Sequence, residues 1–486
     1  MINPGLVTEV PSRAFAWAGP TVRPTAERFA FLLSLVALHI PLGIIFYRSR
    51  TIAMIHPIAV LLVGMYFALR RDQKIERVAY VVAYIVGAEV LWRMARAEML
   101  WEFGKYAVAL IMVTALVRRR LWRMPVWPLM FLIFLLPASL MTAFSEPLGD
   151  AKDMLSFNMS GPFLLFVSCW FFSAAKMPWP KVKKMLLLIA IPIVSIAVIS
   201  LFFTVMIENI KFGTESNYLT SGFFGPNQVS SMLGLGVFMS LTVFLLFRNN
   251  LVSTGLIIAA SVLFAAQSML TFSRGGIYNA VGALGMVMLF RIGDLRKSLG
   301  KLLPMIGFGL LFLLLVYPHL DDFTGGALQA RFESTDTTGR AEIAEADMEI
   351  FLNNPVLGAG VGQAKELREE YFGRAIGAHT EFARIAAEHG LLGILAIIAL
   401  LVGVAGRLVA ERVNLVRALS AGTVAWSLLF MMNSGMRLAA PSFVLGLSFL
   451  TVLFPLRVRG VPPTAAGRRP PSRGAGPAEG GQLENS

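Results

Sequence analysis

Apolar runs of about 18 residues recur along most of this chain, and a run of that length crosses a bilayer as one α-helix. Hydrocarbon offers no hydrogen bonds, so each backbone N–H and C=O must find a partner within its own segment, which excludes an open sheet. The composition agrees, because 56% of the residues are hydrophobic and 15% are charged. Soluble proteins have about 25% charged residues. We therefore expect an all-α polytopic membrane protein.

The apolar runs predict about fourteen transmembrane helices. The first run, Phe29–Phe46, should remain as an uncleaved anchor, because no apolar segment of signal-peptide type precedes it. The expected spans are 29–47, 52–69, 78–92, 104–117, 126–144, 157–175, 185–207, 229–247, 251–270, 275–290, 302–317, 390–406, 418–432 and 438–456.

The basic residues lie mainly in short loops between these expected spans. If the N-terminus is cytoplasmic, most of the 43 Lys and Arg residues fall on the inside, as the positive-inside rule requires. Both termini should then be cytoplasmic. The net charge of +14 does not indicate nucleic-acid binding, since no soluble basic domain and no aromatic interleaving accompany it.

Hydrophilic regions divide the chain into five parts. Residues 1–28 should be a cytoplasmic segment, and residues 29–317 a transmembrane domain of about 11 helices. Residues 318–389 are the one long hydrophilic insertion, which this orientation places outside, where a rigid scaffold can hold functional residues. About three helices should follow in residues 390–456. The Pro-, Gly- and Arg-rich residues 457–486 should form a disordered cytoplasmic tail.

The long outside loop has the pattern of three helices. Thr337 or Thr338 can cap the first helix, and an Asn-Asn-Pro sequence that starts at Asn353 should end it. A second helix should cover residues 363–372. A third should begin near His379 and run into the next span. A lone histidine at a helix start is commonly a solvated or capping residue, and a catalytic base is the alternative.

Three polar residues stand out near the outer ends of the expected spans. Arg274 lies between the ninth and tenth spans, where it either extends to the membrane interface or serves a function. Arg340 lies near a helix start, where the helix dipole disfavours a cation and an anionic ligand would be favourable. Asn227 follows a Gly-Pro turn and could bind sugar or cap a helix.

Other charged groups have simpler interpretations. Glu89 is the main acid within a span, and Arg93 one turn later can pair with it. His389 is expected near a helix end, where the helix dipole favours a histidine. The charged run at residues 366–370 should be a solvated helix face.

Four motifs, in this order, resemble those of the O-antigen ligase and Wzy-type polymerase superfamily. They are Ser-Gly…Pro-Asn at Ser221–Asn227, Ser-Arg-Gly-Gly at Ser273–Gly276, Gly-Arg with Asn-Pro-x-x-Gly-x-Gly at Gly339–Gly360, and His-x-x-Phe…Glu-x-Gly-Leu-Leu-Gly at His379–Gly393. The resemblance covers residues 210–400. It implies a multispan glycosyltransferase with a GT-C-like fold in the bacterial inner membrane, with a periplasmic active site.

The resemblance also implies the substrates and the roles of several residues. The donor would be a glycan on undecaprenyl pyrophosphate, and a second glycan would be the acceptor. Arg274 and Arg340 match arginines that stabilise the leaving pyrophosphate with permanently charged donors. His379 matches a histidine proposed to activate the acceptor hydroxyl, which a neutral imidazole can do. The candidate substrate-binding residues are Asn227, Arg331, Glu381 and Arg437.

Two positions depart from the family's pattern. Thr380 follows the histidine, where asparagine is common, and Ile343 stands where an aromatic residue is common. Many other GT-C enzymes hold a divalent cation on paired acids in the first external loop. That loop, Arg48–Thr51, has no acid here, and Asp321 and Asp322 suit a surface role. We therefore expect metal-independent transfer without a cofactor.

The sequence leaves the acceptor open. We favour a polymerase that joins lipid-linked repeat units, because the divergent N-terminal half fits the more varied polymerases. A flippase and a chain-length regulator would then be its partners. A ligase that moves the finished glycan to a lipid core or a protein is the alternative. A membrane transporter or flippase is the alternative of another class, although such proteins commonly show internal repeats and none is evident here.

Overall fold

The computed structural model describes residues 26–247, 249–291, 295–334, 339–373, 375–434 and 436–454. The expected tail, residues 457–486, lies outside the described residues, and so does most of the expected N-terminal segment, residues 1–28. The expected helix caps Thr337 and Thr338 also lie outside them.

Helices make up most of the described chain, because each apolar run satisfies its backbone within one helix. The first eleven are α1 (Ala26–Arg48), α2 (Arg50–Leu69), α3 (Ile75–Met94), α4 (Phe103–Arg118), α5 (Val126–Ser145), α6 (Leu148–Ala174), α7 (Trp179–Met206), α8 (Pro226–Leu246), α9 (Leu251–Leu270), α10 (Gly275–Leu289) and α11 (Leu295–Leu311). The others are the π-helical turn η2 (Phe312–Val316), α12 (Tyr317–Phe323), α13 (Ala327–Glu333), α14 (Arg340–Asn353), α15 (Gln363–Leu367), α16 (Glu369–Phe372), α17 (Glu381–Ala410), α18 (Asn414–Ser434), α19 (Ala439–Gly446) and the 3₁₀ turn η3 (Leu447–Phe449).

Nine helices within the described residues are long and apolar enough to cross a membrane. Three further apolar stretches are shorter, and they lie in α1, in α10 and in α19 with η3. α3 and α4 coincide with expected spans, but α3 contains the charged Glu89 and Arg93, and α4 has 16 residues. A multi-pass helical membrane protein is thus confirmed, while the number of fourteen spans and the GT-C-like fold stay predictions.

The last expected span, 438–456, is wrong in its second half. α19 ends at Gly446, and the chain passes through η3 into a short strand, β2 (Thr451–Leu453). This strand pairs in parallel with β1 (Lys176–Pro178), which connects α6 to α7. A β-branched Thr-Val pair suits an extended conformation, and the ladder satisfies backbone groups that a continued helix would otherwise have satisfied.

Small residues fix the start of α10 at the centre of the bundle. α7, α9, α10 and α18 surround α8, which is almost completely buried. A Cβ atom at Gly276 would lie 2.0 Å from the Ser230 carbonyl oxygen, and one at Gly234 would lie 2.1 Å from the Gly276 carbonyl oxygen. Small residues let membrane helices approach this closely. The close crossing of α8 and α10 thereby sets the position of Arg274, which precedes α10.

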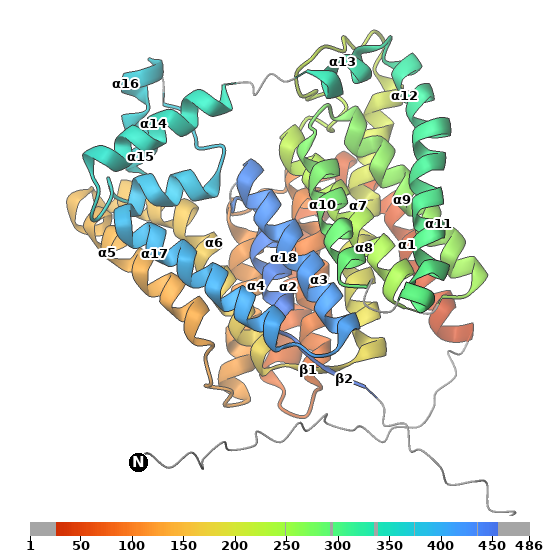
Figure 1. The fold of residues 1–486 in the computed structure, drawn as a ribbon, viewed down its shortest axis with the longest axis horizontal. Coiled ribbons are helices and arrows are strands. Elements are labelled where there is room, and N and C mark those ends of the chain that lie inside the picture. Colours follow the sequence, from red (N-terminus) through yellow and green to blue (C-terminus); the bar gives the residue numbers. More distant parts are fainter. Residues whose placement is uncertain are drawn as a thin grey trace, which may run out of the picture. The chain divides into compact units, whose positions relative to one another are not determined.

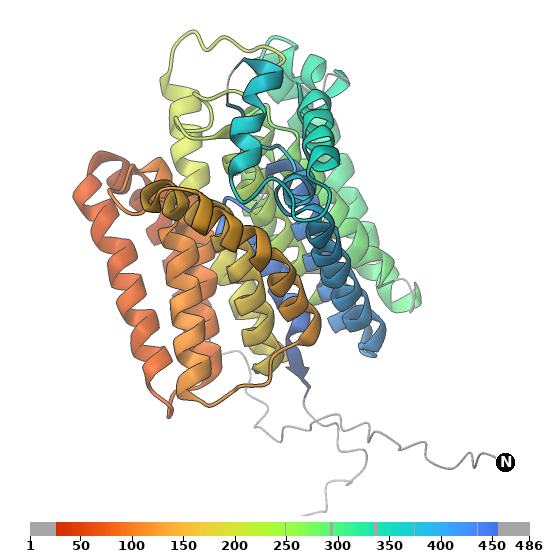
Figure 2. The same cartoon turned by 90° about the vertical axis from the view of Figure 1, so that its left-hand side faces the viewer.

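The helices of the long loop gather at one end of the bundle, and β1 and β2 lie at the opposite end (Figure 1). The same separation is visible from the side (Figure 2). α14 packs against α17, and Ile350, Ala364 and Ala387 form a small apolar cluster of their own. α14 ends at Asn353, as expected, with Gly339 in the position before its first residue.

The predicted second loop helix, residues 363–372, is divided into α15 and α16. The division falls at Arg368, whose side chain is buried and pairs with Asp347 of α14. The expectation of a solvated face is therefore wrong for Arg368, although Glu366 and Glu369 are exposed. The buried partner lies 21 residues earlier, so local spacing could not indicate it.

α17 consists of two helical segments that meet at the non-helical Gly390, so the expected helix end at His389 is confirmed. Gly390 has φ 61° and kinks the helix there, and His389 is fully buried. The kink releases two carbonyls, which accept hydrogen bonds from the loop that follows α14: Ala359 N donates to Ala387 O at 2.9 Å, and Gly360 N donates to Glu388 O at 3.1 Å. The kink therefore attaches the loop to α17.

Replacing Gly390 with alanine should lower the free energy of unfolding by about 1–3 kcal/mol, because a side chain is strained at this φ. Its Cβ atom would also lie 2.6 Å from the Gly358 nitrogen. The detergent-solubilised protein is heated to a series of temperatures, and size-exclusion chromatography then measures the fraction that remains folded at each one. Gly406→Ala is the control, since the same helix offers open space there. Equal unfolding temperatures for wild type and Gly390→Ala would contradict this account.

Candidate active site

His379 lies immediately before α17, as the sequence predicted. The helix cap is Thr380, whose hydroxyl oxygen accepts a hydrogen bond from Ala383 N at 3.1 Å. The capping interpretation of His379 is therefore wrong. Threonine performs here the capping that an asparagine at this position could also perform. The His379 side chain is half-buried.

Three arginines influence the ionisation of His379. Burial lowers the pKa of the His379 imidazole to about 4, and the charges of Arg340, Arg437 and Arg368 act in the same direction. The ring is consequently neutral at physiological pH, with a nitrogen lone pair that can accept a proton.

Arg340 links this histidine to Arg274, since its charge acts on His379 and the charge of Arg274 acts on it. Arg274 precedes α10, and its guanidinium donates a hydrogen bond to the Ser334 carbonyl. This contact directs it toward the loop helices, which does not fit the interpretation of an arginine that extends to the lipid interface. Burial lowers the pKa of Arg340, and the charge of Arg274 lowers it further. An anion between the two guanidinium groups would relieve their repulsion.

Hydrogen bonds join the first two sequence motifs. The Ser273 hydroxyl donates to Asn227 Oδ1 at 2.7 Å, and the Ser230 hydroxyl donates to the Ser273 carbonyl at 2.7 Å. Gly225 occupies the cap position of α8, so Asn227 does not cap that helix. The buried Arg331 Nε donates to the Phe272 carbonyl at 3.0 Å. Both contacts support the turn that presents Arg274.

Arg368 and Arg437 hold the segment that leads into His379. Arg368 bonds the Asp347 carboxylate and also donates to the Ile376 carbonyl at 2.9 Å. Arg437 donates to the Ala378 carbonyl at 3.1 Å. The sequence motifs did not indicate a role for Arg368, because its partners come from elsewhere in the fold.

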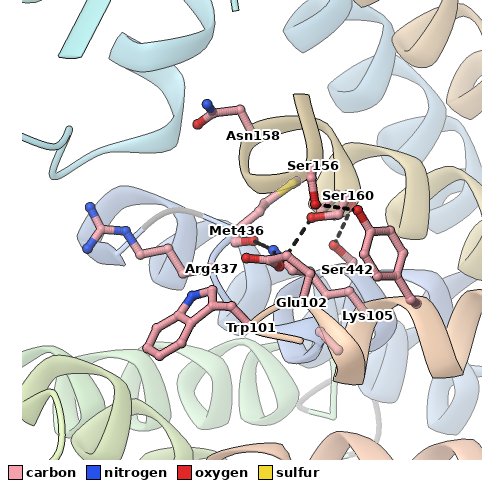
Figure 3. Close-up of polar contacts among 12 residues, drawn as sticks. Trp101, Glu102, Lys105, Ser156, Asn158, Ser160, Met436, Arg437 and Ser442 are labelled. Atoms are coloured by element: carbon pink, nitrogen blue, oxygen red, sulfur yellow. Dashed lines mark hydrogen bonds and ion pairs between the residues drawn. The ribbon is translucent and has the colours of Figure 1, made fainter. Parts of the chain in front are cut away.

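Buried charges from the N-terminal half hold the connection between α18 and α19 (Figure 3). Lys105 pairs with Glu102 and donates to the Met436 carbonyl at 3.1 Å, while the Ser160 hydroxyl donates to Glu102 at 3.2 Å. The sequence analysis missed this pair. The available signal was the spacing of Glu102 and Lys105, two opposite charges three residues apart at the start of an apolar run.

The predicted Glu89–Arg93 pair is confirmed, with 2.6 Å between Oε1 and Nη2. Arg93 also donates to the Arg437 carbonyl at 3.2 Å, and Glu89 accepts from Ala439 N at 2.7 Å. The charges in α3 therefore fix the backbone from the Arg437 carbonyl to Ala439.

Glu381 belongs to the same arrangement. Its carboxylate pairs with Arg384 and accepts from Met436 N at 2.9 Å, and Arg384 pairs with Glu388 as well. Glu381 is 3% exposed. These contacts tie the first turn of α17, next to His379, to the α18–α19 connection.

No three His, Cys, Asp or Glu side chains of the described chain come together as a metal-ligand set. Asp321 accepts a hydrogen bond from Gln329 N at 2.8 Å, which joins α12 to α13. Metal-independent transfer remains a prediction.

Lys105→Met should destabilise the protein strongly, because it leaves the Glu102 carboxylate buried without its cation. Breaking a buried ion pair costs about 3–5 kcal/mol, whereas replacing both partners is milder. The double variant Glu102→Gln/Lys105→Met should therefore unfold at a higher temperature than Lys105→Met alone. Additive losses in a double-mutant cycle would show that the two charges do not interact.

Comparison with known protein families finds a match for the part of the chain that carries most of these site residues. Residues 259–398 match the model of the O-antigen ligase family. The matched segment includes Arg274, Arg340 and His379, while Asn227 and Arg437 lie outside it. No curated protein matches the chain. The chain therefore contains an O-antigen ligase domain at residues 259–398, and this match supports the resemblance to the O-antigen ligase and Wzy-type polymerase superfamily that its motifs predicted.

Proposed function

We propose that this protein is a polysaccharide polymerase. It transfers a glycan from undecaprenyl pyrophosphate to a lipid-linked repeat unit at the periplasmic face of the bacterial inner membrane. The family supports an enzyme of the ligase and polymerase type. The observation that carries the proposal is the position of Arg340, whose charge acts on the neutral His379 and is itself influenced by the charge of Arg274.

The two arginines suit the leaving group of this reaction. A pyrophosphate brings negative charge between the guanidinium groups, and charged donors fixed in advance stabilise developing charge most effectively. No metal ion is required for this role.

His379 suits the acceptor side of the same reaction. In the free enzyme its low pKa makes it neutral but weakly basic. A bound pyrophosphate adds negative charge nearby and raises the pKa of the imidazole. The base therefore becomes stronger when the donor is in place, which couples proton transfer to donor binding.

The proposed reaction is a single glycosyl transfer. An acceptor hydroxyl oxygen forms a bond to the anomeric carbon of the donor, while the bond from that carbon to the pyrophosphate oxygen breaks. His379 accepts the hydroxyl proton on a ring nitrogen. The bonding electron pair leaves with undecaprenyl pyrophosphate, whose charge Arg274 and Arg340 stabilise.

The other candidate residues have different parts in this proposal. Arg437 is a substrate-binding residue, since no carboxylate of the described residues lies within ion-pair distance of it. Asn227, Arg331 and Glu381 act as positioning residues, because their printed contacts are with protein groups around Arg274 and His379. A flippase that supplies the donor and a chain-length regulator are the proposed partners.

A ligase is the second candidate, because the family that matches residues 259–398 is described as O-antigen ligase. It would use the same three residues and differ in its acceptor. A transporter is disfavoured by the contacts of Glu89, the main acid within a span. Both of its oxygens are engaged, one by Arg93 and one by Ala439 N.

Arg274→Ala and His379→Ala should each abolish glycan lengthening, while the protein still inserts in the membrane. Arg340→Lys should also fail, because lysine lacks the planar fork that binds pyrophosphate with two parallel hydrogen bonds. The assay uses purified protein in nanodiscs with the lipid-linked repeat unit of its host and EDTA, and products are separated on a gel. The exposed Arg123→Lys is the control. Wild-type ladders from His379→Ala and Arg274→Ala would disprove the assignment.

The pH dependence of transfer should reveal the coupling between donor and base. Activity is lost as the pH falls through the pKa of His379, because the protonated ring cannot accept a proton. The acid limb of kcat/KM should lie near the free-enzyme pKa of about 4. The limb of kcat should lie at higher pH, since kcat reports the donor complex. A kcat/KM limb near the usual histidine value of about 6.5 would contradict this account.

A further inference from the structure

A pocket of about 430 Å³ opens beside the segment that leads into His379. α6, the α15 region, the first turns of α17 and the α18–α19 connection all contribute to its wall. Small-molecule sites in proteins have volumes of roughly 300–1,000 Å³. The pocket is therefore large enough for a small part of a glycan.

The pocket reaches the catalytic region from the side of Arg437. Gly377 and Ala378 form part of its wall, and Arg437, which bonds the Ala378 carbonyl, forms another part. His379, which follows Ala378 in the chain, does not itself line the pocket, and neither do Arg274 and Arg340. A ligand in this pocket would therefore approach His379 without occupying the place between the two leaving-group arginines.

The charges of the pocket oppose an anionic ligand near its opening. In the interior, Arg384 is neutralised by Glu381 and Glu388. Arg437 is the cation at the other end, and the charge of Glu381 acts on it although the two form no ion pair. Near the opening, Asp150 and Asp153 are exposed, and no cation of the described residues lies within ion-pair distance of either. Two unneutralised carboxylates repel a phosphate or a uronic acid, and they attract an amine.

Two side chains of α6 suit the surface of a sugar ring. Phe157 is 43% exposed and offers an aromatic face to the C–H groups of a pyranose. Asn158 donates to the Met154 carbonyl at 2.9 Å, and its Oδ1 accepts no hydrogen bond from the described residues. This oxygen can accept from a sugar hydroxyl. Asn158 and Arg437 lie apart from the hydrogen-bonded network of Lys105 (Figure 3).

We propose that this pocket binds the terminal sugars of the acceptor glycan and selects neutral or amine-bearing sugars over those with a carboxylate. The inference rests on the proposed function, because it assigns the acceptor side of the same site. The attacking hydroxyl would lie at the His379 end, beside Arg437 and Ala378. The adjoining sugar would lie against Phe157, with its substituents near Asp150 and Asp153.

Binding of small glycosides tests the pocket without any transfer reaction. Saturation-transfer NMR on the full-length protein in nanodiscs would compare a methyl glucoside, a methyl glucosaminide and a methyl glucuronide. The glucuronide should bind roughly ten-fold more weakly than the glucosaminide. Asp150→Asn/Asp153→Asn should remove this preference. Equal binding of all three glycosides to the wild type would overturn the proposed selectivity.

Two phenylalanines of α6 provide a matched pair of variants. Phe157→Ala should weaken glucoside binding roughly five-fold, as expected for loss of an aromatic contact. Phe163→Ala should not, because Phe163 is 41% exposed on the same helix but does not line the pocket. Equal effects of the two variants would overturn the assignment of the site.

Inhibition of transfer separates this inference from the proposed function. The glucoside should inhibit glycan lengthening, with an inhibition constant about five-fold higher in Phe157→Ala than in Phe163→Ala. If transfer requires His379 but the glucoside inhibits both variants equally, the proposed function is supported and the proposed acceptor site in the pocket is wrong. Glycoside binding at Phe157 without any transfer would overturn the function and support a sugar site.

Discussion

The interior of a membrane protein offers almost no water, so every polar backbone group there needs a protein partner. The connection between α18 and α19 meets this requirement with charged side chains. Lys105 and Arg93 donate to its carbonyls, and Glu381 and Glu89 accept from its amides. Each of these charges is also paired with an opposite charge, which offsets the cost of its burial. The rest of the site depends on this arrangement.

The position of Arg437 follows from those contacts. Its backbone is fixed from both sides, so its guanidinium meets the Ala378 carbonyl at the start of the His379 turn. The family match ends at residue 398, yet the backbone of residue 437 is held by α3 and α4. The N-terminal half, whose sequence resembles the family only in being hydrophobic, thus supports the residues that the family motifs identify.

Much of the fold could be predicted from the sequence, because an apolar run that is long enough to cross a bilayer forms an α-helix there. The loop helix that ends at Asn353 and the helix that starts beside His379 followed from capping patterns. The burial of Arg368 and the pairing of β1 with β2 could not be predicted. Each depends on partners far away in the sequence, and local spacing carries no information about them.

The candidate site was predictable as a set of residue types but not as a geometry. The motifs identified Arg274, Arg340 and His379, whose charges influence one another in the structure. They did not separate residues that face a substrate from residues that support them. Arg331 and Glu381 are buried and bonded to protein groups, which became evident only from their contacts.

The pairing of β1 with β2 has a consequence for the order of folding. It joins residues 176–178 to residues 451–453, so this contact cannot form until nearly the whole chain has been synthesised. Contacts between such distant segments form late and slow the folding of the chain. The charges of α3 and α4 enter the membrane long before the backbone of residues 436–439 exists. Until then the opposite charges of the pairs Glu89–Arg93 and Glu102–Lys105 offset one another, which also helps these helices to insert.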